Sequence, residues 1–97
     1  MHISKASKMA SIFNVVSDVQ NILFPSGKVR LEVEQTNQTT YMIYITSPHS
    51  NKIGRVELLV EYEGNDPDPY VVGSVFSRGP VTRNALEVIM DSILERL

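Results

Sequence analysis

Hydrophobic residues recur at helical spacing near both ends of the chain. After the first pattern, Phe24-Pro25-Ser26-Gly27 contains residues that end a helix. Before the second pattern stands Gly79-Pro80, and proline is well tolerated in the first turn of a helix. The patterns therefore predict helices over residues 8–24 and 80–96. One side of the first consists of Ile12, Val15, Val16, Val19, Ile22 and Leu23, and one side of the second consists of Val81, Ala85, Val88, Ile89, Ser92 and Ile93, widened by Leu86, Met90, Leu94 and Leu97.

Between the predicted helices, hydrophobic and polar residues alternate with the two-residue period of half-buried strands. The alternation predicts four strands, over residues 28–34, 39–46, 53–63 and 70–76. Short polar turns join them, so sequential strands are expected to be neighbours in an antiparallel meander. The predicted fold class is α+β, with both helices on one face of the sheet. We expect a flexible N-terminal arm over residues 1–7 and a single domain over residues 8–97.

The same alternation predicts which strand residues face the helices. A shift of one residue in a strand exchanges its two faces, so this prediction depends on the register. We expect Tyr62 to point inward with its strand. The side chains expected to be buried are Val29, Leu31, Ile43, Ile45, Val56, Leu58, Val60, Val72, Ile89 and Ile93. The opposite face is expected to carry an apolar patch, suited to a protein interface, of Met42, Tyr44, Leu59, Val71 and Val75.

Composition limits the classes of protein that fit. The chain has 97 residues, enough for one hydrophobic core, and its 42% hydrophobic and 21% charged residues are typical of a globular domain. There is no cysteine, which excludes disulfides and thiolate sites. No apolar run approaches the roughly 20 residues of a membrane span. We expect a soluble intracellular protein, cytoplasmic or nuclear. Nine basic against eleven acidic residues give no basic excess of the kind that non-specific nucleic-acid binders show.

Few residues suit catalysis or metal binding. His2 lies in the predicted arm, and His49 has no second histidine or carboxylate at ligand spacing. Asp66 and Asp68 stand in a turn, where aspartate commonly forms local hydrogen bonds. No G-x-S-x-G motif occurs, and the lone Gly73 lies inside a strand. We therefore expect no enzymatic activity, no cofactor, no metal and no small-molecule substrate.

The C-terminal part of the chain resembles a known family. Ser47-Pro48-His49 with Ile53, the run Val56-Glu57-Leu58-Leu59-Val60, Val72-Gly73-Ser74 and Ala85 occur in the order of the loop, strands and helix of a double-stranded-RNA-binding domain. The resemblance begins at Tyr41 and implies an α-β-β-β-α fold that binds duplex RNA. The RNA contacts in that case would be His49, Lys52, Arg55, Arg78 and Arg83.

The chain also departs from that family. At the start of the last helix, where the family has several lysines that bind phosphates, this chain has Val81, Thr82 and Arg83, with Leu86 at the final lysine position. The strand over residues 28–34 has no counterpart in the family. A member with these departures would be degenerate, of the kind that dimerises or docks on proteins.

These patterns lead to a ranking of functions. We expect a non-catalytic protein-interaction module that forms a homodimer or a heterodimer through the open sheet face or an edge strand. The first alternative is an RNA-binding domain of the double-stranded-RNA-binding type, although the net charge does not favour a nucleic-acid partner. A second alternative is a small inhibitor or effector protein from a mobile element.

Overall fold

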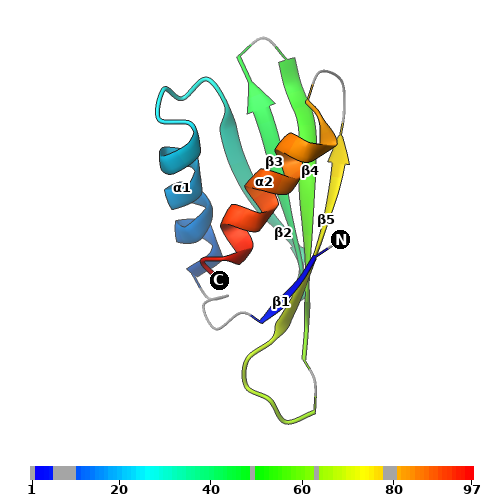
Figure 1. Ribbon diagram of the computed structural model, residues 1–97. Helices are drawn as coiled ribbons and strands as arrows, with labels where there is room; N and C mark the ends of the chain where they lie inside the picture. The colour runs from blue at the N-terminus through cyan, green and yellow to red at the C-terminus, as the bar shows by residue number, and fades with distance from the viewer. Residues whose placement is uncertain (1, 6–10, 49, 63, 78–80) are drawn as a thin grey trace.

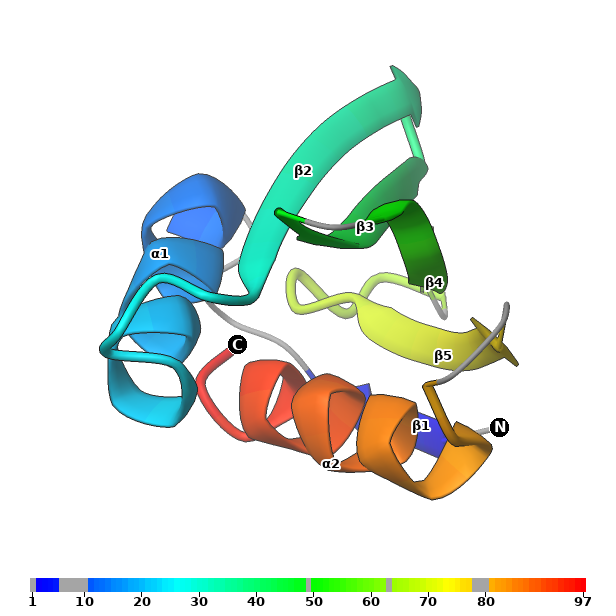
Figure 2. The same cartoon turned by 90° about the horizontal axis from the view of Figure 1, so that it is seen from above.

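The protein is a curved antiparallel sheet with two helices on one of its faces. The computed structural model describes residues 2–5, 11–48, 50–62, 64–77 and 81–97. The elements are β1 (His2–Lys5), α1 (Ile12–Leu23), β2 (Arg30–Asn37), β3 (Thr40–Ser47), β4 (Ser50–Glu61), β5 (Tyr70–Ser77) and α2 (Arg83–Leu94). The strand order is β1-β5-β4-β3-β2, so β2 to β5 form a meander (Figures 1 and 2). The predicted α+β order of helix, four antiparallel strands and helix is confirmed.

β1 is an additional strand that the sequence analysis did not predict. It pairs antiparallel with β5, and the pairs run from His2 with Gly73 to Lys5 with Tyr70. Residues 2–5 of the expected arm therefore form a paired strand, and residues 1, 6 and 7 lie outside the described residues. Four residues are too few to show a periodic pattern. Pairing with β1 satisfies backbone groups that β5 would otherwise present at an edge.

Both helices are shorter than predicted within the described residues. α2 begins after Thr82, whose hydroxyl accepts a hydrogen bond from the backbone N–H of Ala85 at 3.1 Å, as an N-cap residue does. The buried side of α2 is also rotated from the predicted side, since Val88 is 57% exposed and Ala85 is exposed. The buried residues are Ile12, Val15, Val16 and Val19 of α1, and Leu86, Ile89, Met90, Ile93 and Leu94 of α2.

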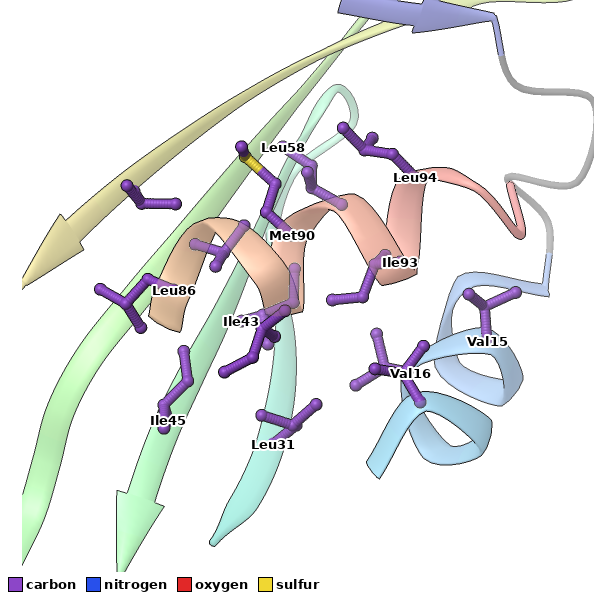
Figure 3. Packing of buried hydrophobic residues seen from close by; sticks show 14 of the residues in the cluster. Val15, Val16, Leu31, Ile43, Ile45, Leu58, Leu86, Met90, Ile93 and Leu94 are labelled. Carbon is purple, nitrogen blue, oxygen red and sulfur yellow. The ribbon is translucent and has the colours of Figure 1, made fainter. Parts of the chain in front are cut away.

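The core lies between the helices and the helix-facing side of the sheet (Figure 3). The register places Val56 of β4 between Ile43 of β3 and Val75 of β5. The buried hydrophobic strand residues are Leu31, Ile43, Ile45, Ile53, Val56, Leu58, Val60, Val71 and Val75. Val29 and Val72, which were expected to be buried, are only half-buried, and Tyr62 is 64% exposed because β4 ends at Glu61.

α2 approaches the sheet closely at two glycines. A Cβ atom added at Gly54 would lie 2.8 Å from Cδ2 of Leu86, and one added at Gly73 would lie 2.5 Å from Sδ of Met90. Both distances are shorter than non-bonded atoms tolerate. Leu86 and Met90 therefore occupy the space that a larger residue's side chain would fill on β4 and β5.

We predict that truncating the core on either side of the helix–sheet boundary destabilises the fold. Leu58→Ala or Ile89→Ala should lower the free energy of unfolding by about 2–5 kcal/mol, because each removes a buried branched side chain and leaves a cavity. Urea denaturation measures this loss. The control is Val88→Ala on the exposed side of α2, which should change stability by less than about 0.5 kcal/mol. Equal losses in the control and the core variants would contradict the assigned packing.

Candidate protein interface on the helix-free sheet face

The helix-free face is the side of β2 to β5 opposite to α1 and α2. Met42, Tyr44 and Leu59 lie on it, as predicted, because their strand neighbours Ile43 and Leu58 face the core. All three of these helix-free side chains are half-buried. No described element covers this face of the four strands.

The prediction for β5 is wrong by one residue. Val71 and Val75, expected on the helix-free face, are 0% and 3% exposed and belong to the core. The register fixes their direction, since Val71 pairs with Val60 and Val75 pairs with Val56. All four of these valines therefore lie on the helix-facing side of the sheet, Val56 and Val60 on β4 and Val71 and Val75 on β5.

The apolar residues of β5 on the helix-free face are instead Tyr70, Val72 and Phe76, and Ser74 lies between the last two. Sequence reasoning missed them because β5 has apolar residues on both faces, and because Gly73 takes a core position that would normally show a large hydrophobic side chain. The available signal was the pairing with β4, whose alternation is clean. Eight residues connect β4 to β5, however, so the sequence does not fix the register of this pairing.

Together these residues form an apolar patch that spans three adjacent strands. The apolar patch consists of Met42, Tyr44, Leu59, Tyr70, Val72 and Phe76. Leu59 and Val72 are direct cross-strand partners at its centre. At one end, the guanidinium carbon of Arg55 lies 4.4 Å from the centroid of the Phe76 ring, a cation–π contact between two paired residues.

The charged residues beside the apolar patch are mostly acidic. Among the strand residues of β2 to β5 whose side chains are described, this face carries four carboxylates and two guanidinium groups, a net charge of −2. The carboxylates are Glu32, Glu34, Glu57 and Glu61, and the guanidinium groups are Arg30 and Arg55. Glu32 pairs directly with Tyr44, and Glu34 and Glu57 both pair with Met42.

The structure does not bring the described RNA-contact residues together. Arg55 lies on the helix-free face, whereas Arg83 lies on α2, which covers the other face. The Nε atom of Arg83 is 3.6 Å from a carboxylate oxygen of Glu87 one turn later. Two of the residues, His49 and Arg78, lie outside the described residues, and the same holds for the side chain of Lys52.

The described residues form neither a metal site nor a membrane-spanning helix. Across residues 2–5, 11–48, 50–62, 64–77 and 81–97, no three histidine or carboxylate side chains form a group that could hold a metal ion. The helices in these ranges are all too short or too polar to cross a bilayer.

Comparison with known proteins gives no relative. No family model matches the chain, and neither the curated proteins nor the solved structures include a significant match. The resemblance to double-stranded-RNA-binding domains stays a prediction.

Two neighbouring residues of β5 test the assignment of its faces. We predict that Val71→Asp lowers the free energy of unfolding by several kcal/mol, because it places an unpaired carboxylate in the core. Val72→Asp should leave a folded protein, because Val72 lies on the helix-free face. Thermal and urea denaturation of the two variants give the comparison. The assignment would be wrong if Val72→Asp were the more destabilising of the two.

Proposed function

We propose that the chain is a non-catalytic protein-interaction module whose helix-free face binds a partner protein. The observation that supports this proposal is the apolar patch on a face that no described element covers. Contiguous exposed apolar surface commonly marks an interaction site. Tyrosines such as Tyr44 and Tyr70 suit an interface, because the ring gives a large apolar contact while the hydroxyl forms hydrogen bonds.

The charge around the apolar patch favours a foreign partner over a second copy. Two copies meeting through this face would each bring a net charge of −2 from the described side chains. Interfaces place opposite potentials against each other, and opposed like charges reduce affinity. The partner therefore has an apolar surface bordered by lysine or arginine. The same acidic border disfavours nucleic acid on this face, because phosphates need cations.

Leu59 is the residue with which to test this proposal, because it lies at the centre of the apolar patch. A photo-reactive amino acid at position 59 identifies the bound protein, which is then purified and titrated against the wild-type chain. We predict that Leu59→Asp weakens this binding by at least about 30-fold, as a charge at the centre of a desolvated interface does. The matched control is Val88→Asp, an equally apolar and 57% exposed position on α2, which should leave affinity unchanged.

Two results would contradict the proposal. The first is a purified partner that binds Leu59→Asp as tightly as wild type, which would place the interface elsewhere. The second is a wild-type dimer in equilibrium sedimentation that Leu59→Asp dissociates, which would make a second copy the occupant of the helix-free face.

A further inference from the structure

β2 is the edge of the sheet on the side away from β1. The hydrogen bonds of an antiparallel pair alternate, so each strand residue directs its N–H and C=O groups to one side only. The N–H of Val60 donates to the carbonyl of Thr39 at 2.7 Å, which shows that odd-numbered residues of β3 bond to β4. The even-numbered residues of β3 therefore bond to their partners Glu32 and Glu34 on β2.

This alternation leaves the backbone groups of Leu31, Val33 and Gln35 directed away from the sheet. A second observation supports it, because the N–H of Leu31 donates to Oε1 of Gln20 on α1 at 3.0 Å instead of to β3. α1 thus covers the first of the three outward positions. Figure 2 shows β2 starting beside α1 and then running away from it.

The accessible part of this edge is short and has defined limits. It begins after Leu31, where Gln20 occupies the outward N–H, and it ends where the pairing of β2 with β3 shifts between Gln35 and Asn37. Within it, Val33 and Gln35 present their outward N–H and C=O groups. Glu32 and Glu34 are exposed and project onto the helix-free face beside this edge.

The charges of Glu32 and Glu34 determine which kind of strand can pair with β2. Antiparallel alignments of two copies centred on Val33 or Glu34 put glutamates directly opposite glutamates, which is destabilising. The alignment centred on Glu32 needs the outward N–H of Leu31, which already donates to Gln20. A strand with lysine or arginine at alternate positions would put opposite charges there. Lysine and glutamate residues at an edge are also a common protection against self-pairing.

We infer that β2 is the docking edge for an extended basic segment of the partner protein, which adds a strand through backbone hydrogen bonds to Val33 and Gln35. Its lysines or arginines, two residues apart, lie opposite Glu32 and Glu34. Strand addition of this kind takes affinity from main-chain bonds and specificity from alternate side chains. The inference rests on the proposed function in that it takes the ligand to be a protein.

The probe for this inference is a synthetic eight-residue peptide in which lysine alternates with threonine, with both ends blocked. We predict saturable binding in fluorescence anisotropy and, at saturation, amide exchange of Val33 and Gln35 at least about tenfold slower in NMR, since hydrogen-bonded amides exchange only on opening. The amides of Glu32 and Glu34 should change little, because they already bond to β3. A peptide with glutamate in place of lysine should not bind.

Gln35 provides a matched pair of variants. Gln35→Pro removes one outward N–H at an exposed edge position, which proline tolerates, and should weaken peptide binding at least about tenfold. Gln35→Ala keeps the N–H and should bind within about twofold of wild type, since surface changes of this kind have small effects. An independent experiment uses the wild-type chain and a peptide that is N-methylated at its threonines. The threonine amides would face β2, and methylation removes their N–H groups. This methylated peptide should therefore not bind.

The outcomes separate this inference from the proposed function. Equal binding by the N-methylated and unmodified peptides, or unchanged exchange at Val33 and Gln35, would overturn strand addition while leaving the helix-free face as the partner's site. Loss of peptide binding in Leu59→Asp but not in Gln35→Pro would show that the peptide lies on the face and not at the edge. A dimer formed through β2 in the absence of peptide would make the second copy its occupant.

Discussion

The contact of α2 with the sheet determines which surfaces of this protein are buried. α2 lies against β4 and β5 where Gly54 and Gly73 leave room, and the side chains of Leu86 and Met90 fill that room. α1 then packs against β2 and against α2 on the same face. A two-layer domain needs only one buried sheet face. Since both helices pack on that face, no described element covers the other one, and its apolar residues are half-buried or, at Phe76, exposed.

The helix-free face and the β2 edge adjoin each other and have the same charge. Glu32 and Glu34 border both, because they project onto the face from the strand that forms the edge. A partner that adds a strand to β2 would extend the sheet and bring its own side chains next to Glu32 and Glu34, which pair with Tyr44 and Met42. One basic protein could therefore engage the backbone at the edge and the apolar patch on the face, and the combined contacts would exceed what either surface offers.

The parts of the fold with a clean alternation could be predicted from the sequence. In β2 and β4, charged residues such as Glu32 and Glu57 alternate with the buried Leu31 and Leu58, and the faces of these strands are confirmed. The faces of β5 could not be predicted, because Gly73 holds a core position and apolar residues stand on both sides. β1 is too short to show a pattern. The same holds for the apolar patch. Its residues on β3 and β4 were identified from the sequence, and its residues on β5 were not.

The function proposed for this protein requires the face carrying Met42 and Leu59 to be open to solvent in the isolated chain. Methyl NMR in the presence of a soluble paramagnetic probe measures this directly, because a probe that approaches a methyl group broadens its signal. We predict strong broadening for Met42 and Leu59 and little for Ile43 and Leu58, their neighbours on the same strands. Equal protection of all four residues would show that the helix-free face is covered and is not a free binding surface.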